Sequence, residues 1–384
     1  MKTHINVLKI QKGRDKMTTK KVQSKPNVKK RRKKKSAKNN KRIFLFVAEM
    51  VILVILLVVL YMVLKADKVN KISIDKENIV VNETVENNVS LKGYRNIALF
   101  GVDARDKSLG KGNRTDTIMI ASVNQETGDV KLLSVYRDTY LNLGNDTYNK
   151  CNAAYAKGGP EQAINMLNMN LDLNIEDYVT VGFTGLMETI DAIGGVEIEI
   201  LEDEIRHLNN YQISMVGTST DGKIFTATEG KDYIAVTHAG RQTLNGLQAT
   251  AYCRVRQVGD DFMRAQRQRD VLAAIMEKAK QSSPATLNKI LDKVLPYVST
   301  SLDVDEMVAV LGEISNYSIV AKDGFPFEQY RATGNLGSKG SCVIPVDLKA
   351  NVLELHKFLF ADEAYEISSE VQSYSQKISA DTGR

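Results

Sequence analysis

The sequence lacks the residues from which several common kinds of functional site are built. Its 384 residues include only three cysteines, which excludes a disulfide-rich scaffold, and no CxxC pair or Cys/His cluster is present to hold zinc. Four histidines leave little room for a multi-histidine metal centre. The chain also has no GxxxxGK[ST], GxSxG or HExxH motif, which argues against the common NTPase, serine hydrolase and zinc peptidase mechanisms.

Negative charge is almost missing from the first 42 residues. They contain 18 lysines and arginines and a single acid, Asp15, so their net charge is +17. The rest of the chain carries 34 basic and 45 acidic residues, a net charge of −11, although the whole chain sums to +6. A basic tail is therefore joined to an acidic body, and the overall pI of about 8.9 does not indicate a nucleic-acid-binding protein.

A long apolar run follows the basic tail. Residues 43–64 contain one charge, Glu49, and as a helix they would span roughly 33 Å, enough for a bilayer core of about 30 Å. No small-residue cleavage site follows the run, which therefore predicts an uncleaved signal anchor. The positive-inside rule places residues 1–42 in the cytoplasm and residues 65–384 outside. We therefore expect a single-pass protein of the plasma membrane.

The external part is expected to form a polar stalk (65–93), a folded catalytic domain (94–365) and a Ser-rich polar tail that frays (366–384). Short apolar runs at 96–102, 117–123 and 130–135 predict strands, and helical spacing is present at 160–169 and 262–280. Because strands and helices alternate along the domain, we expect an α/β fold with a mixed sheet and helices on both of its faces.

Arginines and aspartates gather at the ends of these predicted strands. They are Asp103, Arg105, Arg114, Asp116, Arg137 and Asp138, with a later cluster of Arg254, Arg256, Arg264, Arg267 and Gln268. Guanidinium groups bind phosphate oxygens bidentately, and spaced carboxylates are ligands that Mg²⁺ accepts together with phosphate. The set suits a pyrophosphate with its metal, although surface ion pairs would produce the same pattern.

Several segments carry a more specific signal, in a fixed order. They are NIALFGVDARD, RTDTIMIASVNQETGDVKLLSVYRDTY, YNKCNAAYAKGGPEQAINML, VTVGFTGLMETIDAIGGVEIEI and AGRQTLNGLQATAYCRVRQVGDDFMRAQRQRDVL. Together they closely resemble the LytR–CpsA–Psr family of Gram-positive cell-wall enzymes. The resemblance implies an α/β/α sandwich with a central mixed sheet and an apolar tunnel for a prenyl chain. It also implies transfer of a teichoic-acid-like or capsule-like glycopolymer from an undecaprenyl-(pyro)phosphate carrier to peptidoglycan.

The resemblance also assigns roles to residues. Asp103 and Asp116 match the family's magnesium-binding aspartates, although Mn²⁺ would accept the same oxygen ligands. Six residues match its pyrophosphate-contacting set, and Arg105 and Arg267 lie in the same motifs; the six are Arg114, Arg137, Arg254, Arg256, Arg264 and Gln268.

The catalytic step leaves one choice open. Arg137 is expected to neutralise developing charge, and either Asp103 or Asp138 would accept the proton of the attacking sugar hydroxyl. Apolar residues within 179–183, 186–193 and 271–276 are expected to line the tunnel.

Two alternative functions remain, a lipid-pyrophosphate hydrolase that uses the same site and a non-enzymatic membrane regulator. The basic tail is too short and simple for a recognisable DNA-binding module, so no specific nucleic-acid partner is expected.

Overall fold

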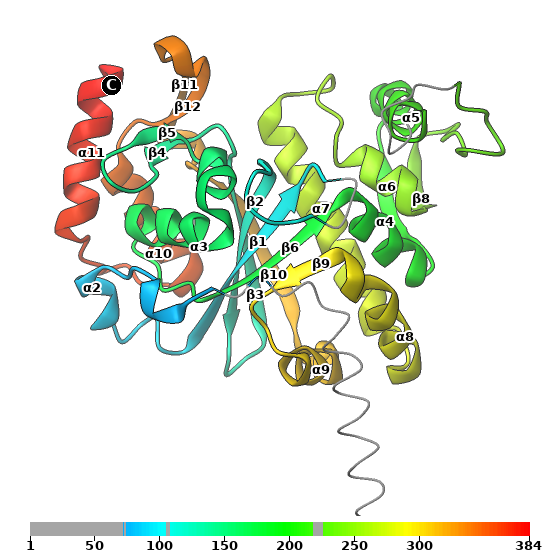
Figure 1. The fold of residues 1–384 in the computed structure, drawn as a ribbon, viewed down its shortest axis with the longest axis horizontal. Helices are drawn as coiled ribbons and strands as arrows, with labels where there is room; N and C mark the ends of the chain where they lie inside the picture. The colour runs from blue at the N-terminus through cyan, green and yellow to red at the C-terminus, as the bar shows by residue number, and fades with distance from the viewer. Residues whose placement is uncertain (1–71, 73, 105–107, 218–225) are drawn as a thin grey trace, which may run out of the picture. The chain divides into compact units, whose positions relative to one another are not determined.

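The computed structural model describes residues 72, 74–104, 108–217 and 226–384 (Figure 1). The basic tail 1–42, the apolar run 43–64, the beginning of the expected stalk and Arg105 lie outside the described residues. All the described residues belong to one unit, Val58–Arg384. Within them, no helix combines the length and the apolar composition needed to cross a bilayer.

A six-stranded mixed sheet forms the centre of this unit (Figure 1). Its strand order is β10 (Ser318–Phe325), β3 (Asp129–Val135), β2 (Thr115–Asn124), β1 (Tyr94–Val102), β6 (Asp177–Gly182) and β9 (Val298–Thr300). The β1–β6 and β10–β3 pairs are parallel, and the other pairs are antiparallel. The expected mixed sheet is therefore confirmed.

The two faces of the sheet are packed differently. Along β1, Ala98, Phe100 and Val102 belong to the main hydrophobic core, whereas Leu99 is half-buried on the opposite face. Successive side chains of a strand point to opposite faces, so this alternation follows directly from the strand geometry. One face is therefore tightly packed, while the other retains partly exposed apolar side chains.

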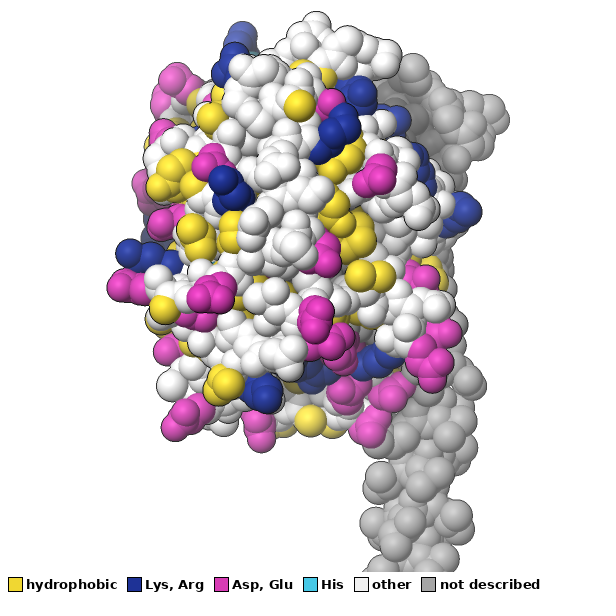
Figure 2. Space-filling model, turned by 90° about the vertical axis from the view of Figure 1, so that its left-hand side faces the viewer, with side chains coloured by type: hydrophobic (Ala, Val, Ile, Leu, Met, Phe, Trp, Pro, Cys, Tyr) yellow, Lys and Arg dark blue, Asp and Glu magenta, His cyan; other side chains and the backbone are white. Residues whose placement is uncertain are grey.

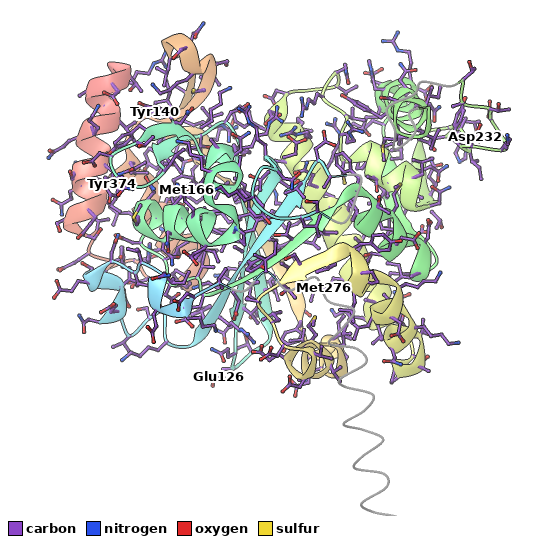
Figure 3. The ribbon with its side chains drawn as sticks, in the orientation of Figure 1. Glu126, Tyr140, Met166, Asp232, Met276 and Tyr374 are labelled. Atoms are coloured by element: carbon purple, nitrogen blue, oxygen red, sulfur yellow. The ribbon has the colours of Figure 1, made fainter. Side chains whose placement is uncertain are left out.

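Helices cover both faces, as the sequence predicted. On the tightly packed side lie α3 (Asn152–Leu171), α10 (Leu348–Phe360) and α11 (Ser369–Thr382). On the other side lie α4 (Phe183–Ala192), α5 (Glu202–Val216), α6 (Gly246–Tyr252) and α7 (Asp261–Lys280). Met166 on α3 and Met276 on α7 mark the two sides in Figure 3.

Smaller elements complete the described part of the chain. Three two-stranded sheets are β4 (Tyr140–Asn142) with β5 (Tyr148–Lys150), β7 (Val196–Ile200) with β8 (Gly240–Leu244), and β11 (Arg331–Asn335) with β12 (Ser341–Pro345). The remaining α-helices are α2 (Glu83–Glu86), α8 (Pro284–Val294) and α9 (Val304–Gly312). The remaining short 3₁₀ turns are η1 (Lys76–Asn78), η2 (Leu295–Tyr297), η3 (Ile314–Asn316), η4 (Glu328–Tyr330) and η5 (Gly337–Lys339).

Two segments differ from their sequence-based interpretation. The Ser-rich end of the chain, expected to fray, forms α11, because Ser368 caps its first turn and Val371 and Ile378 are buried in the main core. The last part of the expected stalk also lies against the domain, where the Asn82 amide donates to the buried Asp172 carboxylate at 2.5 Å. Long-range packing, which local polarity does not reveal, orders both segments.

A buried ion pair fixes α5 against α7. Arg267 Nε lies 2.7 Å from Glu204 Oε1, and both side chains are only 2% exposed. The same guanidinium donates to the carbonyl oxygens of Val255 at 3.0 Å and Val258 at 2.7 Å. Arg267 therefore also holds the loop between α6 and α7, from which two of the predicted site arginines project.

Replacing only one residue of this pair is expected to lower the free energy of unfolding more than replacing both. Arg267→Met leaves the Glu204 carboxylate buried without its partner, so the free energy of unfolding should fall by about 3–5 kcal/mol. The double variant Arg267→Met/Glu204→Leu should recover part of that loss, because neither charge is then buried. Denaturant unfolding of the full chain in detergent measures both values.

Arg241→Ala is the matched control, since Arg241 lies 3.9 Å from Glu197 but is 75% exposed. Removing this exposed pair should change the free energy of unfolding by less than about 1 kcal/mol. An Arg267→Met variant as stable as the control would contradict the role given to the buried pair.

Candidate active site

An apolar cavity of about 570 Å³ lies between the sheet and the helices of its less tightly packed face. Leu99 of β1, Met119 of β2, and Val179 and Val181 of β6 form its floor. These positions alternate along each strand with residues of the main core, which places them on the opposite face. The expected tunnel walls at 179–183, 186–193 and 271–276 contribute Val179, Val181, Phe183, Leu186, Val271, Leu272 and Ile275 to the lining.

Helix α7 runs from the polar end of the cavity to its apolar interior. Asp260 caps the helix by accepting from the backbone N–H groups of Phe262 and Met263. The side chains that line the cavity recur every three or four residues, as one face of a helix requires. They are Arg264, Gln268, Val271, Leu272 and Ile275 in order along the helix. A single helical stripe thus changes from charged to apolar along its length.

The polar end of the cavity collects the residues that the sequence predicted for phosphate and metal binding. Eight of them line it: Asp103, Arg114, Asp116, Arg137, Arg254, Arg256, Arg264 and Gln268. They come from the ends of β1, β2 and β3 and from the α6–α7 region, which are far apart in sequence. A Cβ atom added to Gly182 would lie 2.7 Å from the Ala104 carbonyl oxygen, so only glycine lets the segment after β1 approach this closely.

The arginines at this end are interleaved with carboxylates. Arg137 Nη1 forms an ion pair with Asp116 Oδ1, and its Nε lies 3.8 Å from Asp261 Oδ2. Arg264 Nη2 donates to Asp261 Oδ2 at 3.0 Å and to the Asp116 carbonyl oxygen at 3.3 Å. Arg256 lies 4.0 Å from both Asp116 and Asp261. Each carboxylate therefore separates several guanidinium groups.

Positive charge still exceeds negative charge at the cavity. Five arginines line it against two aspartates, Asp103 and Asp116. Burial alone would lower the pKa of Arg137, but the surrounding aspartates together raise it above its ordinary value. Burial lowers the pKa of Arg264 to about 10, against the effect of Asp261 and aided by Arg137 and Arg256. Both groups stay charged at neutral pH, so the site favours an anion.

Arg254 is held by aromatic rings. Its guanidinium carbon lies 4.6 Å from the ring centroid of Phe183 and 5.4 Å from that of Tyr211. A guanidinium stacked in this way keeps its N–H donors directed outward along the plane of the group. Phe183 and Tyr211, both in the cavity lining, therefore orient the donors of Arg254.

Two predicted residues lie outside the cavity lining, and a third is not among the described residues. Arg105 lies outside the described residues. Arg267 is buried in its pair with Glu204 and does not line the cavity, so its surroundings favour a positioning role over direct contact with phosphate. Asp138 stands beside the cavity rather than in its lining, with Lys150 Nζ at 3.3 Å and Arg137 Nε at 3.7 Å.

Some residues of the site were missed by sequence reasoning. Asp261 contacts three of the arginines, and its only sequence signal is the Asp260-Asp261 pair just before a predicted helix. Tyr211 lies in α5, a helix that neither a motif nor hydrophobic spacing predicts. The cysteines are free and buried, and burial raises the pKa of Cys253 to about 12, so this thiol is protonated at neutral pH. A cysteine nucleophile at the cavity is thereby disfavoured.

The donor set is compatible with a hard cation. Among the described residues, no group of three or more His, Cys, Asp or Glu side chains is arranged as a metal site. Asp103 and Asp116 nevertheless line the same cavity. Mg²⁺ commonly binds through one or two carboxylates and completes its shell with phosphate oxygens and water, which fits this pair.

Comparisons with known proteins find relatives among teichoic acid transferases. The chain is 32% identical over 251 residues to the polyisoprenyl-teichoic acid–peptidoglycan teichoic acid transferase TagU of Halalkalibacterium halodurans, covering 64% of this chain and 71% of the relative. The crystal structure of TagV from B. subtilis is 25% identical with a TM-score of 0.53, covering 70% of this chain and 98% of that one.

A further structure shows the same fold with a lipid. The LytR-CPS2A-psr family protein YwtF (TagT), solved with bound octaprenyl pyrophosphate, has a TM-score of 0.51 and 20% identity, covering 73% of this chain and 96% of that one. Residues 56–351 of the chain match the model of the LytR_cpsA_psr family. The protein is therefore a member of the LytR_cpsA_psr family.

Proposed function

We propose that this protein transfers a teichoic-acid-like or capsule-like glycopolymer from an undecaprenyl-(pyro)phosphate carrier to peptidoglycan. The observation that carries the proposal is an apolar cavity whose polar end is lined by five arginines. A prenyl pyrophosphate has the same two parts, a hydrocarbon chain and a strongly anionic head. The related TagU enzymes are named for polyisoprenyl-teichoic acid and peptidoglycan, which supports both the donor and the acceptor class.

Phosphotransfer supplies a balanced reaction for this site. The acceptor hydroxyl oxygen forms a bond to the phosphorus that carries the sugar, and the bond from that phosphorus to the bridging oxygen breaks. Prenyl monophosphate leaves, and a phosphodiester joins the polymer to the glycan. The leaving phosphate gains negative charge, which Arg137, Arg256 and Arg264 would neutralise in a cavity whose apolar walls limit screening by water.

A carboxylate at the cavity would accept the hydroxyl proton. Asp103 lines the cavity, whereas Asp138 lies beside it and is engaged by Lys150 and Arg137. Asp103 is also a proposed ligand of the metal, so Asp138 would accept the proton when Asp103 holds the cation, and Asp103 would accept it otherwise.

Asp103 and Asp116 are the residues that would hold Mg²⁺, and Mn²⁺ would accept the same ligands. The ion would supply charge neutralisation at the pyrophosphate. Arg137 pairs with Asp116 in the structure, so this aspartate would share its charge between the guanidinium and the cation.

The proposed topology places this site outside the cell. Residues 43–64 would span the plasma membrane once, with residues 1–42 in the cytoplasm and the domain on the outer side. Peptidoglycan lies outside the membrane, so this orientation puts the cavity where the acceptor is.

Loss of Arg137 is expected to abolish most of the activity. Arg137→Ala should lower the rate of polymer transfer to peptidoglycan at least about 100-fold, because a preorganised donor to the developing charge is removed. Arg137→Lys should restore little, since an ammonium cannot reproduce the forked contacts with Asp116 and Asp261. The assay uses the full chain with lipid-linked polymer and peptidoglycan oligosaccharides.

Arg241→Ala is the control for the loss of one arginine on the same domain. Half or more of the wild-type rate in Arg137→Ala would contradict the assignment. Release of free polymer without an adduct would favour the hydrolase instead.

Removal of divalent cations is expected to inactivate the enzyme reversibly. Chelation should stop transfer, and added Mg²⁺ should restore it. Asp103→Asn should raise the Mg²⁺ concentration needed for half-maximal binding of prenyl pyrophosphate about tenfold or more, a readout by calorimetry that does not depend on turnover. Asp305→Asn, an exposed residue of α9, is the control. Full activity in a chelator would exclude the metal.

The topology can be tested separately from the chemistry. Single cysteines placed in residues 1–42 and in the exposed Asn335 position should differ in labelling by a membrane-impermeant thiol reagent on intact cells. We expect labelling only at the second position. Labelling of the basic tail from outside would reverse the proposed orientation.

A further inference from the structure

A second cavity, of about 620 Å³, opens on the domain and shares no lining residue with the arginine-lined cavity described above. The β4–β5 hairpin, the segment between β11 and β12, and the C-terminal end of α11 enclose it. Figure 3 labels Tyr140 of β4 beside the upper end of α11. Its lining is almost entirely polar, with tyrosine, lysine, aspartate and asparagine side chains, so it is not an extension of the apolar cavity.

The charges of this second cavity are balanced. Lys339 and Lys377 face Asp146 and Asp381, and Lys377 is directly paired with Asp381. The Tyr140 hydroxyl donates to Asp381 Oδ2 at 2.9 Å. Figure 2, which views this side of the molecule, shows side chains of both signs toward its upper end, while acidic side chains gather toward its lower edge. A polyanion would therefore gain little net attraction here.

Aromatic rings lie directly beneath the two lysines. Lys339 Nζ is 5.6 Å from the ring centroid of Tyr140, and Lys377 Nζ is 5.5 Å from that of Tyr148. Both tyrosines are buried, at 3% and 9% exposure, so the polar groups around the rings, and not the ring faces, meet a ligand. The ammonium, carboxylate and amide groups of the lining supply donors and acceptors that suit the hydroxyl groups of a sugar.

The second cavity is joined to the first by a short segment. Tyr140 follows Arg137 by three residues, so their Cα atoms are at most about 11 Å apart. Between them, the Val343 N–H of β12 donates to the Asp138 carbonyl oxygen at 2.9 Å, and Thr139 bridges to Val343. Figure 1 shows β4, β5, β11 and β12 toward the same end of the domain as the C-terminal end of β1. One extended polymer could therefore reach both cavities.

We propose that this second cavity binds the acceptor glycan strand of peptidoglycan and presents one of its hydroxyl groups to the site at Arg137. The proposal rests on the proposed function and specifies where the acceptor is held. A hydroxyl-rich sugar strand, whose charge density is lower than that of a polyphosphate, fits the balanced charges better than a polyphosphate would. The family match ends at residue 351, so Lys377 and Asp381 add to the cavity from outside the matched region.

The test separates acceptor from donor in kinetics. The full chain in lipid nanodiscs is assayed with soluble peptidoglycan glycan strands and lipid-linked polymer, each varied in turn. Lys339→Ala and the double variant Lys339→Ala/Asp146→Asn should raise the half-saturating glycan concentration about three- to tenfold, the worth of one or two hydrogen bonds. The half-saturating donor concentration should stay within about twofold of wild type.

Two further measurements complete the test. Calorimetric titration with glycan strands alone, without donor, should show the same loss of affinity in the variants. Lys349→Ala, an exposed lysine on α10 outside the cavity, is the control and should match wild type in both assays. Thermal unfolding of each variant tests whether the substitutions leave the fold intact.

The outcomes are distinct. An unchanged glycan dependence in the double variant overturns the proposal, and a shift in the donor dependence instead assigns the cavity to the polymer and also overturns it. Glycan binding that depends on Lys339 in a protein without transfer activity would support the acceptor site while refuting the proposed function.

Discussion

Repulsion between guanidinium groups governs the organisation of this site. Five arginines line one end of a cavity whose other walls are apolar, where water screens charge poorly. Asp116 and Asp261 lie between them and make the arrangement possible without neutralising it. Phe183 and Tyr211 hold Arg254 by stacking, which adds no negative charge. The aspartates thus balance part of the positive charge of the arginines, and an anionic ligand would balance the rest.

The same arrangement explains how an acidic domain would bind an anion. The chain beyond residue 42 carries a net charge of −11, yet the cavity lining is positive. Exposed acids far from the cavity are screened within about 10 Å at ordinary ionic strength, whereas the arginines act at contact distance. The local arrangement of charge, rather than the sum, therefore determines which ligand is favoured.

Much of this could be predicted from local sequence. Strands at 96–102, 117–123 and 130–135 are short apolar runs whose pattern survives folding, and the arginines follow or precede them within a few residues. The features that local sequence does not predict are those that depend on contacts between distant parts of the chain. The sheet gains β10 from residues nearly 200 positions after β3, and α11 is ordered by two buried side chains on an otherwise polar helix.

Among the site residues, those in local motifs could be predicted from the sequence, whereas those defined by tertiary contacts could not. Motif residues such as Arg114 and Arg264 were identified because their local strings resemble a known family. Arg267 belongs to such a string as well, but its partner Glu204 lies 63 positions away, so only the folded chain reveals that it is internal. Asp261 was missed for the converse reason, since its three arginine partners come from two separate regions of the chain.

The alternation along β1 has a consequence for how this protein can change. Phe100 packs in the core and Leu99 faces the cavity, one residue apart. A shift of one residue in the pairing of β1 would exchange these two sets of side chains. Substitutions at Leu99 can reshape the space available to a hydrocarbon chain, whereas an insertion in β1 would damage the core and the cavity together. Under the proposed function, a change in the preferred lipid should therefore arise by substitution of side chains, with the length of β1 unchanged.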